Sequence, residues 1–246
     1  MPEVDLRKTG IWLLIGWIAA TALFRGAPEV DLWIAALPYR TGHGFGGLVP
    51  ASWEWLRLRI WDLSIILFLV SIPLWALARK IARPVLRVSA RGWAYVFWLY
   101  LLGPVIIVNG ILKAYSGRAR PYKIEEFGGE LTFTPVLQLS DQCSRNCSFV
   151  SGEVAAAVVL SLLIWMGLEL WRRHMQPWTI YFGRAVAVFI TGFICAQRIV
   201  DGRHFASDTV FAALVVLSVA WVLYGFLNAH WASSVHALVR RRIRRG

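Results

Sequence analysis

The chain has 246 residues, of which 58% are hydrophobic, and its mean hydropathy is +0.57. Charged residues make up only 16%, against about a quarter in an average soluble domain, so the composition argues against an ordinary soluble protein and indicates one solvated mainly by lipid. The formal net charge of +12 comes from Lys and Arg in short loops and a C-terminal tail. Attraction of these residues to anionic lipid head groups is a sufficient reason for the excess positive charge. We therefore expect no nucleic-acid partner.

Six apolar runs predict an all-α, polytopic membrane protein whose residues 1–246 form a single transmembrane domain. A hydrocarbon core roughly 30 Å thick requires about 20 apolar residues per helix. Helices are expected because lipid offers no hydrogen-bond partner to an open strand edge. The predicted spans are residues 10–24, 61–78, 93–112, 149–171, 178–200 and 205–227.

The first run has a second interpretation. Arg7 and Lys8 precede it and an Ala-Thr-Ala sequence lies near its end, so it is either a span or a secretory signal. After it, residues 25–56 contain Pro and a Gly-rich stretch, which favours an outward loop with one short interfacial helix around residues 32–37.

The distribution of Lys and Arg predicts the orientation in the membrane. In the six-span arrangement most basic loop and tail residues fall on one side, which the positive-inside rule makes cytoplasmic. We therefore expect both termini in the cytoplasm and the opposite loops to face outward. The residues on the cytoplasmic side are Arg7, Lys8, Arg79, Lys80, Arg83, Arg87, Arg91, Arg172, Arg173, Arg240, Arg241, Arg242, Arg244 and Arg245.

Cysteine is sparse. Cys143 and Cys147 lie four positions apart in the second large outward loop, residues 115–148, and are either a disulfide or two free thiols. Two Cys without a nearby second pair or a His are an incomplete set of metal ligands, so no metal site is expected.

Two cations follow the third apolar run. Lys113 ends the run, and Arg120 comes seven residues later, before a proline that stops helical continuation. A compact ammonium group beside a forked guanidinium group suits the oxygens of a phosphoryl group. The alternative is that both residues extend from the membrane interface towards water.

A short polar sequence, Ser151-Gly152-Glu153, opens the fourth run. The backbone N–H groups of a helix start attract anions, and a glycine would let a phosphate approach closely. The same sequence is also what an ordinary N-cap looks like, with a Ser cap and an acidic residue in the first turn.

The last cluster is Arg198 with His204 and Asp208, at the boundary between the fifth and sixth runs. His204 and Asp208 are four apart, so we expect them on one helix face, where the carboxylate holds one imidazole nitrogen and leaves the other free to attack. Ionisable residues at a membrane boundary favour a functional site, although a structural ion-pair network is the alternative.

The order and spacing of the three clusters resemble the type 2 phosphatidic acid phosphatase (PAP2) superfamily of integral membrane lipid phosphatases. The family pattern is Lys, six residues, Arg-Pro; then Pro-Ser-Gly-His; then Ser-Arg, five residues, His, three residues, Asp. This chain reads KAYSGRARP from Lys113, VSGE from Val150 and QRIVDGRHFASD from Gln197. The sequence around Glu153 resembles the branch that contains lipid A phosphatases, including those for the 4′ position.

The resemblance implies a PAP2-like helical bundle and a role for each residue. His204 would attack phosphorus and form a phosphohistidine, and Asp208 would orient it. The phosphoryl oxygens would be bound by Lys113, Arg120, Arg198 and the backbone at Ser151 and Gly152. No metal or cofactor is required, because these cations supply the positive charge.

Glu153 departs from the family pattern, which has His at this position. In the family that His is thought to protonate the leaving oxygen, whereas a carboxyl group in water is ionised at neutral pH. Glu153 therefore serves as the general acid only if its surroundings keep it protonated.

With this resemblance we expect a phosphoric monoester hydrolase of the bacterial inner membrane, acting on a phosphorylated membrane lipid from the periplasmic side, with the 4′-phosphate of lipid A as the best candidate. Other candidate substrates are undecaprenyl pyrophosphate, phosphatidylglycerophosphate and phosphatidic acid. The chain would otherwise be a lipid phosphotransferase, or a protein that binds or translocates phospholipid without catalysis.

Overall fold

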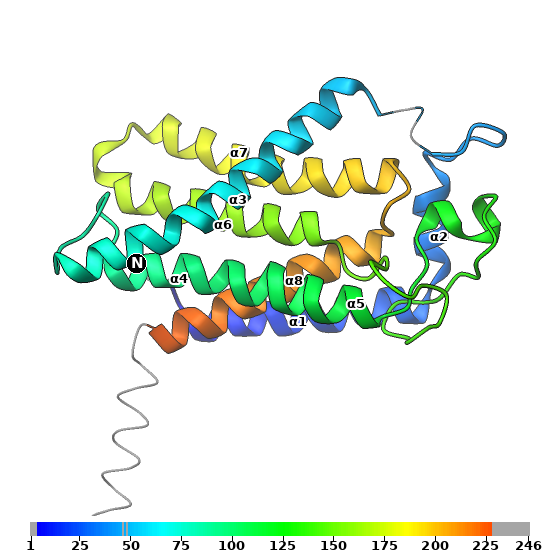
Figure 1. Ribbon diagram of the computed structural model, residues 1–246, viewed down its shortest axis with the longest axis horizontal. Helices are drawn as coiled ribbons and strands as arrows, with labels where there is room; N and C mark the ends of the chain where they lie inside the picture. Colours follow the sequence, from blue (N-terminus) through cyan, green and yellow to red (C-terminus); the bar gives the residue numbers. More distant parts are fainter. Residues whose placement is uncertain (1–3, 46, 48, 228–246) are drawn as a thin grey trace, which may run out of the picture.

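The computed structural model of the protein describes residues 4–45, 47 and 49–227, and over these residues it is helical apart from turns, loops and isolated β-bridges. The predicted cytoplasmic tail, with Arg240 to Arg245, lies outside the described residues. The α-helices are α1 (Leu6–Gly26), α2 (Glu29–Ala36), α3 (Ala51–Lys80), α4 (Ala90–Tyr100), α5 (Lys113–Tyr115), α6 (Gly152–Trp171), α7 (Pro177–Val200) and α8 (Ala206–Leu227). A π-helical segment, η1 (Leu101–Leu112), joins α4 to α5 without a break (Figure 1).

Within the described residues, six helices are long and apolar enough to cross a membrane, which confirms the predicted all-α, six-span fold. They are Leu6–Gly26, Ala51–Lys80, Ala90–Tyr115, Gly152–His174, Pro177–Val200 and Ala206–Leu227.

The largest error concerns the start of the second span, which begins at Ala51 and not near residue 61. Its first turns contain Glu54 and Arg57, whose side chains form an ion pair with each other. Arg57 also forms an ion pair with Glu153, in the first turn of α6. Hydropathy alone therefore assigned a helical segment to a loop.

Local sequence signals explain where the helices begin. Ser151 caps α6, because its hydroxyl accepts from the N–H of Val154 at 3.4 Å. Ser89 caps α4 in the same way, and Pro177 is the first residue of α7. The expected short helix in the first outward loop is α2, which begins at Glu29.

The helices pack in pairs along their length (Figure 1). α1 runs beside α8, where the Trp17 indole donates to the Ser218 hydroxyl at 3.0 Å and the Trp221 indole donates to the Leu6 carbonyl at 2.9 Å. α6 packs on α7, and the Ser161 hydroxyl donates to the Ala187 carbonyl at 2.6 Å. These contacts make α1 part of the helical bundle.

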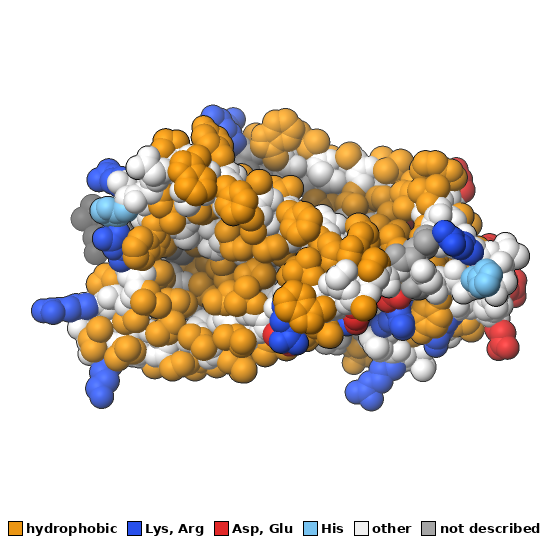
Figure 2. Space-filling view, turned by 90° about the horizontal axis from the view of Figure 1, so that it is seen from above, with side chains coloured by type: hydrophobic (Ala, Val, Ile, Leu, Met, Phe, Trp, Pro, Cys, Tyr) orange, Lys and Arg blue, Asp and Glu red, His pale blue; other side chains and the backbone are white. Residues whose placement is uncertain are grey.

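The outer surface is apolar along the middle of the bundle and charged towards its ends. Figure 2 shows hydrophobic side chains over most of the face in view, with Lys and Arg gathered mainly at the two ends. Many large apolar side chains on the spans are exposed, including Trp12, Ile18 and Phe189. Lipid is the solvent that such a surface requires.

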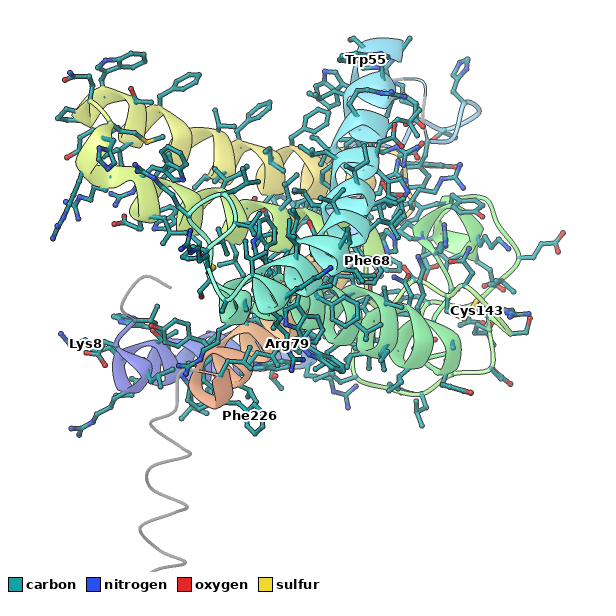
Figure 3. The ribbon with its side chains drawn as sticks, turned by 60° about the vertical axis from the view of Figure 1, so that its left-hand side comes forward. Lys8, Trp55, Phe68, Arg79, Cys143 and Phe226 are labelled. Carbon is teal, nitrogen blue, oxygen red and sulfur yellow. A yellow bond between two sulfur atoms is a disulfide. The ribbon has the colours of Figure 1, made fainter. Side chains whose placement is uncertain are left out.

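The two loops predicted to face outward form a folded layer at one end of the bundle, together with α2 (Figure 1). A small apolar cluster of Ala35, Ala119, Ile124, Phe127 and Phe205 joins α2 and the second loop to the start of α8. Cys143 and Cys147 are joined by a disulfide in the same layer, where Figure 3 labels Cys143. The layer therefore packs against Phe205, the residue that follows His204.

Two glycines permit close backbone approaches in this layer. Gly117 has a φ of +67°, and a Cβ there would overlap the backbone carbonyl of Ser140. This residue turns the chain between Lys113 and Arg120. Gly152 lies against the Asn109 side chain, where a Cβ would come within 2.5 Å of Oδ1. Close helix packing is thus a sufficient reason for glycine at this position.

Candidate active site

The three sequence clusters meet at Ser148. In the backbone, the N–H of Cys147 donates to the carbonyl of Lys113 at 3.1 Å, and the N–H of Ser148 donates to that of Arg118 at 2.9 Å. The carbonyl of Ser148 lies 2.8 Å from Nδ1 of His204. Segments that are far apart in sequence are thereby joined at the loop end of the bundle.

Two further backbone hydrogen bonds connect Arg198 and the start of α6 to the segment that contains His204 and Asp208. The N–H of His204 donates to the carbonyl of Arg198 at 3.2 Å, and the N–H of Ser151 donates to the carbonyl of Asp208 at 3.2 Å. The candidate residues of the second and third clusters are therefore neighbours in space.

The hydrogen bond to Ser148 fixes the chemical state of the His204 ring. A carbonyl oxygen only accepts hydrogen bonds, so Nδ1 carries the proton in this arrangement. In a neutral imidazole the other nitrogen, Nε2, then has a free lone pair. The His204 ring is thus oriented by a backbone group, with Nε2 as its unprotonated nitrogen.

This arrangement differs from the expected His–Asp pair in two respects. His204 precedes α8 and lies in the turn after α7, so it does not share a helix face with Asp208. Oδ2 of Asp208 is 3.7 Å from Nδ1 of His204, which is ion-pair range but too long for a hydrogen bond. The Ser148 carbonyl takes the position that the carboxylate was expected to occupy.

Asp208 is instead held by several donors of its own. Its Oδ2 accepts from the Ser148 hydroxyl at 2.5 Å and from the N–H of Phe205 at 2.9 Å. Its Oδ1 accepts from Arg118 at 2.7 Å. Asp208 therefore fixes both Ser148 and the turn that carries His204, and acts on the imidazole through its nearby negative charge.

Sequence analysis missed a buried ion-pair network behind this carboxylate. The Arg118 guanidinium bonds Asp208 and also Asp31 of α2, the latter at 2.8 Å, and it is only 1% exposed. The Ser207 hydroxyl bonds Asp31 as well. A signal was present, because Asp31 is an acidic residue in the otherwise apolar stretch VDLWIAA.

Glu153 forms an ion pair with two arginines. Its carboxylate accepts from Arg57 of α3 at 2.8 Å and from Arg198 of α7 at 3.1 Å. Arg57 also pairs with Glu54, one turn earlier on α3. In this arrangement Glu153 is a hydrogen-bond acceptor that bridges α3, α6 and α7.

The Arg198 guanidinium is surrounded by acceptors. Besides Glu153, it donates to the Gln197 side chain at 2.5 Å and to Asp201 at 3.1 Å. Gln197, which stands where the family has Ser, also donates to Glu54 at 3.2 Å. Arg198 is therefore oriented by a network that includes the part of α3 predicted to be a loop.

Lys113 and Arg120 are both half-buried. Nη2 of Arg120 donates to the carbonyl of Asn146 at 2.9 Å and to its side-chain oxygen at 3.0 Å. Burial lowers the pKa of His204, and the positive charges of Lys113 and Arg120 lower it further, while Asp208 opposes the shift. The two cations thus lie close enough to influence the imidazole electrostatically.

Ser151 and Gly152 are both packed against neighbouring residues at the start of α6. The Ser151 side chain is completely buried and caps α6, and Gly152 contacts Asn109. The structure therefore places them at a helix start beside Asp208, in agreement with the N-cap interpretation.

Comparison with known proteins identifies the family. The family model described as the PAP2 superfamily matches residues 91–232. The chain belongs to the PAP2 superfamily. The matched range includes all the candidate residues from Lys113 to Asp208, whereas Asp31, Glu54 and Arg57 lie before it.

The chain is similar to three proteins named lipid A 4′-phosphatase. One from Rhizobium etli is 30% identical over 245 residues, 88% of this chain and 91% of the relative. One from Rhizobium leguminosarum is 29% identical over 227 residues, 82% and 93% of the two chains. One from Francisella tularensis subsp. novicida is 35% identical over 126 residues, about half of each chain (51% and 54%).

A solved structure shares the fold. It is a transmembrane PAP2-type phosphatidylglycerolphosphate phosphatase from Bacillus subtilis, with a TM-score of 0.54 and 16% sequence identity, and the similarity covers 90% of this chain and 95% of that one. At this identity the similarity supports the architecture only.

Substituting Arg118 tests the buried network. Arg118→Gln leaves two buried carboxylates without their cation, so we expect a loss of about 3–5 kcal/mol in the free energy of unfolding. Arg59→Gln removes an exposed pair with Asp62 and should cost less than about 1 kcal/mol. Unfolding in detergent, followed with denaturant, measures both. Equal stabilities for the two variants would mean that the network has no structural importance.

Proposed function

We propose that the protein is a membrane lipid phosphatase that removes a phosphate monoester, best matched by the 4′-phosphate of lipid A. The observation that supports this most directly is the oriented Nε2 of His204 in a buried turn close to Lys113 and Arg120. The names of three relatives support the choice of lipid.

In the proposed reaction the Nε2 lone pair of His204 attacks phosphorus. The P–N bond forms as the bond from phosphorus to the lipid oxygen breaks, and that oxygen leaves with a proton. Water then attacks the phosphohistidine and gives a proton back to the group that protonated the lipid oxygen, while the P–N bond breaks, which releases orthophosphate and restores the imidazole. The Nδ1–H remains bonded to the Ser148 carbonyl throughout, and Asp208 stabilises the positive charge that the ring acquires.

Three cations would bind the phosphoryl oxygens and stabilise the transition state: Lys113, Arg120 and Arg198. The N-terminus of α6, at Ser151 and Gly152, would add a positive helix dipole. Arg198 uses three of its five N–H groups to bind Gln197, Glu153 and Asp201, and a phosphoryl oxygen that takes the N–H bound to Glu153 would replace that carboxylate contact.

This exchange gives Glu153 a specific role. When a phosphoryl oxygen replaces it on Arg198, Glu153 loses one of its two cations and lies next to the phosphate. Both changes favour its protonated form, so it becomes able to give a proton to the leaving oxygen. If Glu153 only orients Arg57 and Arg198, another group or water must supply the proton.

We further propose that residues 1–246 act as one transmembrane domain in a bacterial inner membrane. The loop layer and the site would face the periplasm, and the opposite, Arg-rich end would face the cytoplasm with both termini. The positive-inside rule supports this orientation.

Phosphate release from purified protein in detergent tests the function. The panel is lipid A, undecaprenyl pyrophosphate, phosphatidylglycerophosphate and phosphatidic acid. We expect orthophosphate from lipid A, and a loss of more than about 10³-fold in rate for His204→Ala. His43→Ala, which changes an exposed histidine of the loop layer, is the matched control.

Two other outcomes would contradict hydrolysis. A newly phosphorylated lipid in place of orthophosphate would indicate a phosphotransferase. No release from any lipid across a broad pH range would indicate a binding or translocation protein, in which Glu153 permanently neutralises the arginines.

The pH dependence of kcat/KM tests the proposed state of His204. The nucleophile must be neutral, so activity is lost as the pH falls through its pKa. Burial lowers that pKa, so we expect the acid limb below about pH 6.5, the ordinary value for His. Asp208→Asn removes the charge that raises the pKa and should move the limb lower still. The substrate titrates equally with both proteins, so a limb in the same place for both would contradict this role.

Substitutions of Glu153 distinguish its two roles. Glu153→Gln keeps the shape and hydrogen-bonding capacity but has no acidic proton, so we expect kcat to fall by about 10²-fold or more if Glu153 is the acid. A lipid analogue with a better leaving group should recover most of the rate, because it needs no protonation. Equal turnover of Glu153→Gln and wild type would remove Glu153 from proton transfer. Glu153→His, which restores the family residue, reports whether the pocket requires a carboxyl group.

A further inference from the structure

A second concentration of positive charge lies beside the active site, in the loop layer. It is a polar cavity of about 440 Å³, and four cations line it: Arg120, Lys123, Arg145 and Arg203. No acidic residue is among the described residues of its lining. The disulfide residue Cys143, which Figure 3 labels in the loop layer, forms part of the same wall.

Contacts within the wall orient several of these side chains. The guanidinium of Arg203 lies over the Tyr122 ring at 5.0 Å, and the ammonium of Lys123 lies 5.8 Å from the same ring. Arg203 also pairs with Asp201 at 3.2 Å. The Arg120 guanidinium is fixed by its two bonds to Asn146. Three of the four cations are therefore positioned by the Tyr122 ring or by Asn146, which lies in the loop closed by the disulfide.

Arg120 connects the cavity to the reaction centre. It lines the cavity, and its charge also acts on His204. A group in the cavity and a phosphoryl group at His204 would therefore belong to one ligand if that ligand carried two anionic groups on the same head group.

Charge balance indicates what the cavity binds. Asp201 pairs with Arg203 from outside the lining, but the described lining has four cations and no carboxylate, so an oxyanion with several acceptor oxygens would stabilise the arrangement. A cavity of this volume is within the range of small-ligand sites and is large enough for a phosphate with part of a sugar.

We propose that this cavity is a second phosphate subsite, which binds a phosphate group that is not cleaved. The inference rests on the proposed function and adds a preference for lipid head groups with two phosphates. Lys123 and Arg145 would be the specificity-determining residues, since both are exposed and neither belongs to the proposed catalytic set. The orthophosphate released by the reaction has the same chemistry and is the other possible source of the bound group.

Two matched lipids test the proposal: lipid A with two phosphates, and the same lipid with only the 4′-phosphate. We expect wild type to favour the doubly phosphorylated lipid by about tenfold in kcat/KM, mainly through KM, because one phosphate gains charge-assisted hydrogen bonds. Lys123→Gln and Arg145→Gln should each reduce that preference several-fold. Arg40→Gln, which changes an exposed cation of the loop layer outside the cavity lining, should keep it.

The outcomes separate the cavity from general attraction to the surface. Equal use of the two lipids by wild type, or an equal loss in all three variants, would overturn the proposal. Product inhibition by orthophosphate identifies the source of the phosphate. If Arg145→Gln weakens inhibition but leaves the lipid preference unchanged, the cavity binds the released product.

Direct binding of the two lipids in detergent, measured without turnover, keeps the test independent of catalysis. If neither lipid is hydrolysed but Arg145→Gln removes a binding preference for the doubly phosphorylated one, the proposed function fails and the subsite stands. The absence of any binding preference in wild type would overturn the subsite.

Discussion

The arrangement of the site depends on one buried arginine between two buried carboxylates. Arg118 bonds Asp31 of α2 and Asp208 of α8, and all three side chains are almost completely inaccessible to solvent. Burial raises the pKa of Asp31, and the charge of Asp208 adds to the rise, while Arg118 opposes it. Removing any one of the three charges would leave the others unbalanced in a medium that solvates them poorly. The network therefore holds α2, the loop segment around Arg118 and α8 together.

A second ionic network joins α3, α6 and α7. Glu153 and Arg198, with Arg57 of α3, join three spans near the loop layer. The two networks have different consequences. The Arg118 network is sealed and fixes the geometry, whereas Glu153 is partly exposed and its partner Arg198 is a candidate phosphate ligand. In the proposed reaction, exchange of acceptors on Arg198 would link substrate binding to the contacts of Glu153.

The sequence predicted the features that follow from solvent and from short-range spacing. Six spans follow from hydropathy, and the cations, the imidazole and the α6 start follow from motif order. The sequence did not predict contacts between distant segments. The Ser148 carbonyl has no side-chain signature, so its bond to His204 was assigned to Asp208. Arg118 was overlooked among other cations, and Arg57 lay in a segment too polar to be recognised as part of a span. These partners are set by tertiary packing, which local patterns do not encode.

The central claim is that His204 Nε2 becomes covalently bound to phosphorus, and rapid quenching during turnover of a lipid labelled in its phosphate tests it most directly. We predict an acid-labile, base-stable label on the peptide that contains His204, which is absent from His204→Ala and present in His43→Ala. Steady release of labelled orthophosphate with no protein-bound label at any quench time, together with inversion of configuration at phosphorus, would mean that water attacks directly and would contradict the account.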